Sequence, residues 1–147
     1  MKNISLLVLS CIYLSLNAMG QEWTSVQQSE LMSATNEDPQ IRASEASYYD
    51  LNFDVCYDEL LQVQNGETVI LPMPNGDFQE FSLEENNAMA EGLRQNYPGI
   101  RTFNAMSMES GSIWGKVEIS HKGLRAMIFS PGKSTVFIDP VFKSSPY

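Results

Sequence analysis

The clearest pattern along the chain is an alternation of apolar and polar residues between Gly111 and Pro140. One set of alternate positions comprises Ile113, Val117 and Ile119, then Leu124, Ala126 and Ile128, then Val136 and Ile138. A period of two is typical of β-strands. Gly and Pro in residues 120–123 and 130–133 favour turns between these runs. The pattern predicts three consecutive strands that form an antiparallel meander.

The opposite face of these strands is also apolar. Trp114, Phe129 and Phe137 fall on it, because successive side chains of a strand point to opposite faces. A sheet that is apolar on both faces must be covered on both sides, by its own helices or by another domain. The three aromatic residues are therefore our candidate partner surface.

A β-hairpin is predicted around Asn75-Gly76, which lies between the apolar segments 68–74 and 77–83. This dipeptide tolerates positive φ and favours a two-residue turn. Pro72 and Pro74 cannot donate to a strand ladder. The first strand of the hairpin is therefore expected to end at the turn or to lie on an edge of the sheet.

The remaining periodic segments predict two short helices and two more strands. Residues 48–53 and 100–106 alternate as strands do, and residues 56–63 have the spacing of a short helix. Residues 87–96 predict a second helix, with an Asn cap and Glu91 near its start. The predicted fold class is α+β, with a mainly antiparallel sheet and two short helices.

The first twenty residues have the features of a secretory signal peptide. A basic Lys2 precedes the apolar run 4–16, and small residues precede a cleavage site between Gly20 and Gln21. The run is too short for a comfortable membrane span, so a retained anchor is the weaker interpretation and stable membrane insertion is not expected. We expect the protein to be secreted or periplasmic after cleavage.

The rest of the chain is predicted to form a single folded domain with flanking segments. Residues 21–46 are polar and are expected to be a flexible leader, residues 47–142 to be the folded domain, and residues 143–147 to be a tail. After cleavage Cys56 is the only cysteine, so the domain can form no internal disulfide and must be stabilised by packing.

Charge is distributed unevenly along the chain. Residues 21–100 contain 15 acidic and 2 basic side chains, whereas residues 101–147 contain 3 acidic and 6 basic ones. The acidic part argues against nucleic acid or an anionic membrane as a partner. It serves either solubility or attraction to a basic surface elsewhere.

Candidate chemistry is sparse. The only histidine, His121, falls in a predicted turn, and one histidine with one mature cysteine is too few for a zinc site or a Cys-His nucleophile pair. The adjacent carboxylates Asp58-Glu59 and Glu84-Glu85 diverge in direction and are expected to be solvated charges. We predict no catalytic, cofactor-binding or metal-ligating residue, no cofactor and no enzymatic activity.

Several sequence blocks occur in an order and spacing that are similar to those of a known family. They comprise Tyr49, Leu51, Glu59 and Leu60, then residues 71–81, 89–93, 97–103, 123–130 and 136–140. Over residues 48–142 the chain resembles the N-terminal pro-region of secreted reprolysin-like zinc metallopeptidases of the Bacteroidetes type. Its closing block also looks like the end of the broader reprolysin and snake-venom-type prodomain.

The resemblance implies a pro-region that assists folding or maintains latency of a zinc metallopeptidase catalytic domain, in cis or in trans. The sequence contains no such catalytic domain, so we expect either a truncated reading frame or a stand-alone protein. Cys56 is the only candidate for a latency thiol that would bind the catalytic zinc; the simpler interpretation is a small core residue at the start of a helix. The alternative function is a free-standing secreted binding or adhesion module that uses the aromatic face around Trp114 and Phe137.

Overall fold

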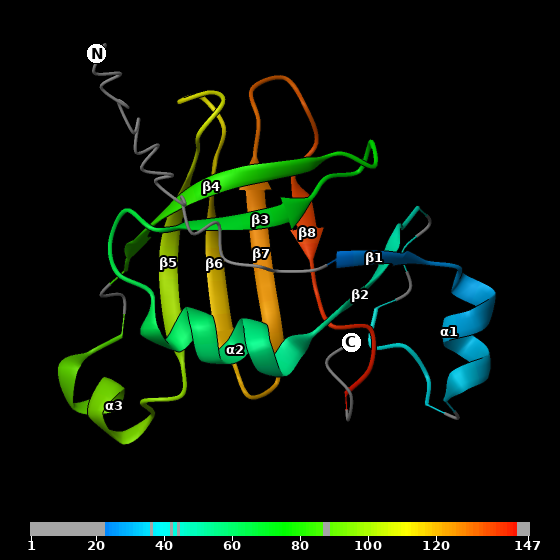
Figure 1. The fold of residues 1–147 in the computed structure, drawn as a ribbon, viewed down its shortest axis with the longest axis horizontal. Helices are drawn as coiled ribbons and strands as arrows, with labels where there is room; N and C mark the ends of the chain where they lie inside the picture. Colours follow the sequence, from blue (N-terminus) through cyan, green and yellow to red (C-terminus); the bar gives the residue numbers. More distant parts are fainter. Residues whose placement is uncertain (1–22, 36, 42, 44, 87–88, 144–147) are drawn as a thin grey trace, which may run out of the picture.

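The computed structural model describes residues 23–143 except 36, 42, 44, 87 and 88. Six strands in chain order form one antiparallel sheet, β3-β4-β5-β6-β7-β8 (Figure 1). They are β3 (Thr68–Pro72), β4 (Phe78–Glu85), β5 (Arg101–Ser107), β6 (Trp114–Ser120), β7 (Gly123–Phe129) and β8 (Val136–Ile138). The predicted C-terminal meander is confirmed as β6, β7 and β8, and the α+β fold class is confirmed with it.

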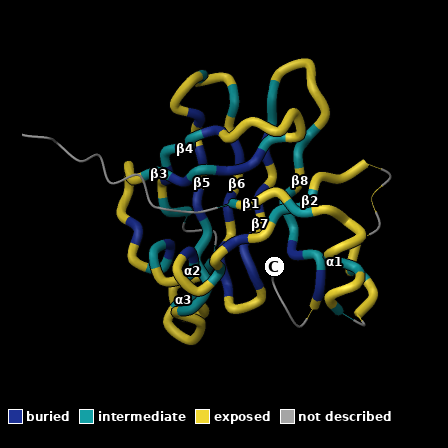
Figure 2. Tube along the Cα trace, turned by 45° about the vertical axis from the view of Figure 1, so that its right-hand side comes forward, coloured by how far each residue is buried: buried dark blue, intermediate teal, exposed yellow. Residues whose placement is uncertain are grey.

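The sheet curls, and a single helix lies against its inner face. In Figure 1, β3 and β4 cross in front of the upper part of β5 to β8, and helix α2 (Phe53–Gln62) lies across the lower part on the same side. The side chains enclosed between them form the core: Cys56, Leu60, Val69, Leu71, Phe81, Leu83, Phe103, Val117, Ile119, Leu124 and Ile128. The core strands thus bury alternate residues, and Figure 2 shows buried and exposed positions in the same strands.

The β3–β4 hairpin is present, but its loop is longer than predicted. The Met73 N–H donates to the Asp77 carbonyl at 2.8 Å, and the Gly76 N–H donates to the Met73 carbonyl at 2.9 Å. The loop is therefore Pro74–Gly76, a turn followed by a glycine with a φ of 86°. Proline suits the first central position of such a turn, so the turn begins one residue earlier than Asn75. Pro72 ends the edge strand β3, as the sequence indicated.

The segment predicted to be a polar leader contains secondary structure. Strand β1 (Trp23–Val26) pairs antiparallel with β2 (Tyr48–Leu51), and helix α1 (Gln28–Ala34) follows β1. The Trp23 indole N–H donates to the Ile70 carbonyl of β3 at 2.9 Å, and its ring packs against the core. One amphipathic side chain thus attaches a segment whose low content of apolar residues predicted no structure.

The helices differ from the prediction in number and in length. The described residues contain three, and α3 spans only Glu91–Asn96, with Ala90 at its N-cap and no side-chain cap. The expected Asn cap at Asn87 and the whole of residues 1–20, including the Gly20–Gln21 cleavage site, lie outside the described residues. None of the helices in the described part of the chain is long and apolar enough to cross a membrane.

Arg101, the first residue of β5, joins the sheet to the end of α2. Its Nη1 donates to the backbone oxygens of Leu60, Leu61 and Val63 at 3.2, 2.9 and 2.9 Å. Its Nη2 donates to the Glu85 carboxylate at 2.9 Å. The last carbonyls of a helix have no intrahelical partners and carry partial negative charge. The guanidinium satisfies these groups and fixes the end of α2 against the inner face.

Replacing Arg101 should destabilise the fold substantially. Arg101→Met leaves the α2 carbonyls and Glu85 without their donor, and we expect a loss of about 2 to 4 kcal/mol in the free energy of unfolding. Urea denaturation measures this loss. Arg94→Met is the control, because Arg94 pairs with Glu91 on the exposed surface of α3; equal losses in both variants would contradict the role given to Arg101.

Gly115 in β6 should not tolerate a side chain. A Cβ there would lie 2.5 Å from the Met127 carbonyl oxygen and 2.5 Å from the Ile128 Cδ1 atom. Gly115→Ala should therefore cost about 1 to 3 kcal/mol of stability. Gly111→Ala is the matched control, since no atom lies within 4 Å of its added Cβ, and a comparable loss in that variant would show that the close approach is not the cause.

Candidate functional site: the outer face of the sheet

The face of β5 to β8 that points away from α2 carries large apolar side chains. In the strand register Met106 lies beside Trp114, Trp114 beside Phe129, and Met127 beside Phe137. We call these five side chains the outer apolar face. The strands place them together because each occupies the set of alternating positions that points away from the core.

These side chains remain accessible in the structure. The exposed fractions are 47% for Met106, 45% for Trp114, 38% for Met127 and 62% for Phe137. The Trp114 and Phe129 rings stack, with centroids 4.4 Å apart and planes at 26°. The sequence correctly predicted that both faces are apolar. The cover expected on both sides is present on one only, within the residues that the structure describes.

A charged residue interrupts this apolar surface. Lys116 of β6 lies between Asn104 and Met127 in the register, and it forms no ion pair within the described part of the chain. A shallow groove of about 280 Å³ runs beside it, and Met127 and Phe137 are among the residues that line the groove.

At the polar end of the groove, the positive charge of Arg125 is partly neutralised by neighbouring carboxylates. Arg125 lies beside Glu118 in the register, and its Nε is 3.9 Å from an oxygen of Asp139. Partial burial raises the pKa of the Asp139 carboxyl, and the Arg125 charge opposes this effect. Arg125 thus has acidic neighbours, whereas Lys116 lies next to an amide and a thioether.

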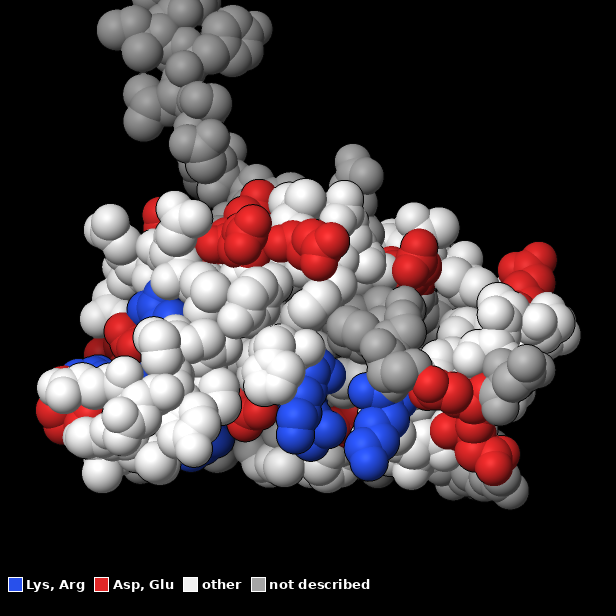
Figure 3. Space-filling model, turned by 90° about the horizontal axis from the view of Figure 1, so that it is seen from below, with Lys and Arg blue, Asp and Glu red and all other residues white. Residues whose placement is uncertain are grey.

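The opposite side of the molecule is acidic. Acidic side chains gather along the α2 side, which is uppermost in Figure 3. A second hollow, of about 460 Å³, lies there and is lined by Val55, Asp58, Glu59, Gln62 and Glu67. Among the described residues, no group of three or more His, Cys, Asp or Glu side chains is placed to hold a metal ion.

The predicted carboxylate pairs diverge as expected, but not all of them are simply solvated. Asp58 is exposed, whereas one oxygen of Glu59 is buried and has no hydrogen-bond partner among the described residues. Glu84 is exposed, but Glu85 bonds Arg101. The prediction of four solvated charges is wrong for Glu85, because its carboxylate accepts a hydrogen bond from the Arg101 guanidinium.

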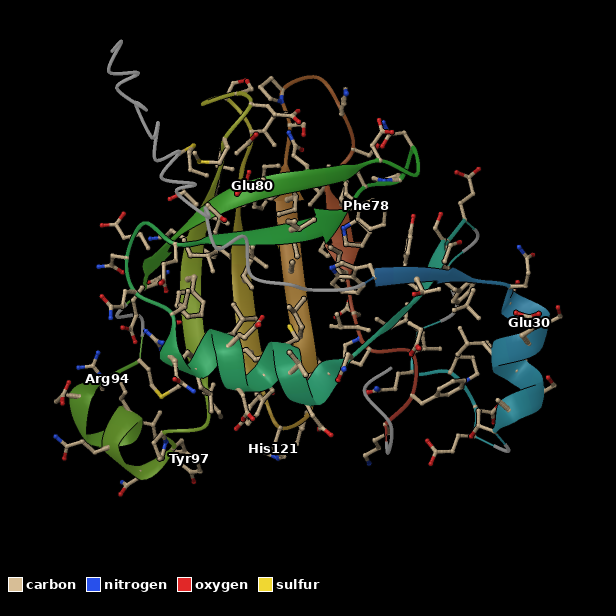
Figure 4. All side chains as sticks on the ribbon, viewed as in Figure 1. Glu30, Phe78, Glu80, Arg94, Tyr97 and His121 are labelled. Carbon is tan, nitrogen blue, oxygen red and sulfur yellow. The ribbon has the colours of Figure 1, made fainter. Side chains whose placement is uncertain are left out.

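The two candidate reactive residues have ordinary positions. His121 is exposed at the tip of the β6–β7 turn, as predicted, and Figure 4 shows it at the far end of these strands. Cys56 is 1% exposed in the core. Burial raises the pKa of its thiol to about 12, and the nearby Glu59 carboxylate adds to this effect. A zinc-binding thiol must be accessible and deprotonated, so this structure gives Cys56 a packing role.

Sequence reasoning identified Trp114, Phe129 and Phe137 but missed Met106, Met127 and Lys116. Alternation in residues 100–106 and 123–129 already assigned Met106 and Met127 to faces. Which residues become neighbours depends on strand order and register, which local patterns do not specify. No protein-family model, no curated protein and no solved structure matches the chain.

The burial of Cys56 predicts a pH dependence of stability. The folded thiol stays protonated to about pH 12, while the unfolded thiol ionises near its ordinary value of 9.0. The unfolded chain therefore binds fewer protons, and stability should fall between these two values by up to about 1.4 kcal/mol per pH unit.

The measurement compares urea denaturation of Cys11→Ser with that of the double variant Cys11→Ser/Cys56→Ala from about pH 8 to about pH 10.5. Cys11 is the other cysteine of the sequence, and because both variants lack it, only the Cys56 thiol distinguishes them. As pH rises, the free energy of unfolding should fall more steeply for the variant that keeps Cys56. If the two free energies change with pH in parallel, the raised pKa of Cys56 is refuted.

Proposed function

We propose that this protein is a non-catalytic, exported binding domain that associates through the outer apolar face with a folded partner, a reprolysin-like zinc metallopeptidase catalytic domain. The observation that carries the proposal is the accessible, contiguous set of Met106, Trp114, Met127 and Phe137 on an ordered sheet. Contiguous exposed apolar surface of this kind marks interaction sites. The choice of partner is supported by the sequence resemblance.

The energetics of the face favour a rigid, preorganised contact. Aromatic side chains in paired strands lose little conformational freedom on binding, and the Trp114–Phe129 stack already fixes two of them. Each half-exposed side chain that a partner covers contributes roughly 1 kcal/mol. A few such contacts suffice for micromolar association once the entropic cost is met.

Association of this kind accounts for both roles that the resemblance implies. A domain that binds only the folded peptidase stabilises it by mass action, which assists folding. The same bound domain maintains latency where it blocks substrate access. Neither role requires a thiolate on the catalytic zinc, which agrees with the buried position of Cys56.

The second candidate is a free-standing module that binds a glycan or a peptide. Its support is the exposed aromatic pair Trp114 and Phe137, since aromatic surfaces suit the apolar faces of such ligands. Affinity for a glycan or peptide without affinity for any peptidase domain would favour this candidate.

Mixing the purified protein with a separately produced homologous catalytic domain tests the first proposal. We expect binding by calorimetry, together with slower peptide hydrolysis or a higher yield of refolded peptidase. Trp114→Ser should weaken the association roughly fivefold or more, because it removes a central apolar contact. Tyr97→Ser is the control, since Tyr97 is 54% exposed at the C-cap of α3, away from the outer apolar face (Figure 4).

Two results would contradict the proposal. One is the absence of binding, inhibition and any effect on refolding. The other is an equal effect of the Trp114 and Tyr97 substitutions, which would exclude the outer apolar face as the contact surface.

A further inference from the structure

We infer that the outer apolar face recognises a partner segment in which a carboxylate is flanked by apolar side chains, and that Lys116 binds this carboxylate. The identity of the partner rests on the proposed function, while the chemistry of the segment follows from the face itself. The inference starts from the position of Lys116 among apolar neighbours.

Lys116 lies where a docked partner must cover it. Met127 is its neighbour on β7, and Trp114 precedes it by two residues on the same face of β6. Phe137 lies one strand further on, beside Met127. A partner that contacts both Trp114 and Met127 therefore approaches the ammonium group as well, although Asn104 and Glu118 lie on its other two sides.

A purely apolar partner would be penalised at this point. Covering an ammonium group without supplying a counter-charge is unfavourable, because the group loses hydration and gains no partner. A carboxylate on the partner removes most of this cost and adds a charge-assisted hydrogen bond. Lys116 thus weakens the binding of partners that lack a carboxylate as well as strengthening the binding of partners that have one.

The charged groups around the face leave Lys116 available to a ligand. Glu118 follows it by two residues on β6 but lies beside Arg125 in the register. Asp139 also lies next to Arg125. Glu84 is separated from Lys116 by Asn104 on β5. The local acidic groups are therefore closer to Arg125 or one strand away.

The shape of the surface sets the flanking chemistry. Met127 and Phe137, which suit an aliphatic or aromatic side chain, line the groove beside Lys116 together with polar residues that include Arg125 and Asp139. Trp114 offers a second apolar contact, about 7 Å from Lys116 along β6. An extended segment with alternating apolar, acidic and apolar residues matches this spacing.

Two matched peptides test the inference without any peptidase. Acetyl-Ser-Phe-Glu-Leu-Ser-amide carries the carboxylate, and its Gln analogue has the same shape without the charge. Each is titrated into the purified ¹⁵N-labelled protein, and amide chemical shifts are followed. We expect the Glu peptide to shift the signals of Lys116, Met127 and Phe137, and the Gln peptide to bind roughly threefold to tenfold more weakly.

Variants assign the effect to Lys116. Lys116→Met should reduce the affinity for the Glu peptide to that for the Gln peptide. Lys122→Met removes the same charge from the exposed β6–β7 turn and should leave both affinities unchanged. The inference is overturned by any of three results: no shifts on this face, equal affinity for the two peptides, or equal effects of the two lysine variants.

The outcomes separate the inference from the proposed function. Peptide discrimination without binding to a catalytic domain would overturn the choice of partner and support the chemistry of the face. Binding to a catalytic domain that Lys116→Met leaves unchanged would overturn the inference and support the partner.

Discussion

A six-stranded meander that curls around one ten-residue helix can bury only one of its faces. The inner face closes because β3 and β4 cross the upper part of β5 to β8 while α2 lies across the lower part (Figure 1). Strand geometry then sends every second side chain of β5 to β8 to the outer side. Since those positions include Met106, Trp114, Met127, Phe129 and Phe137, the constraint that forms the core also creates the accessible apolar surface.

The covered side depends on how α2 is held. A short helix has little intrinsic stability in water, so α2 needs its contacts with the sheet. Its buried residues Cys56 and Leu60 supply packing, and Arg101 supplies the donors for its last carbonyls. Because Arg101 begins β5 and bonds Glu85 at the end of β4, the helix is fixed to the centre of the meander. The strands of the outer apolar face are therefore held by contacts on the other side of the sheet.

Local sequence patterns predicted the features that depend on neighbouring residues in the chain, namely strand faces and turns. Alternation in β6, β7 and β8 was clear enough to assign both faces, and Asn75-Gly76 indicated the β3–β4 hairpin. The loop length was wrong because Pro74 favours an earlier turn start. The ordered segment around β1 was missed because its attachment depends on one long-range bond, from Trp23 to Ile70. Local patterns could not predict that Lys116 lies beside Met127 either, since register arises from pairing between strands.

The edge strand β3 is partly blocked against pairing with other chains, whereas the outer apolar face is not covered. An exposed edge strand invites uncontrolled pairing with other chains. On β3 this is limited by Pro72, which has no N–H to donate, and by Trp23, which occupies the Ile70 carbonyl. The outer apolar face has no comparable cover among the described residues, and the charge beside it is Lys116, which lies between Met127 and Asn104. A charge there opposes indiscriminate apolar contact, and in the proposed association the same residue would select for a partner that supplies a carboxylate.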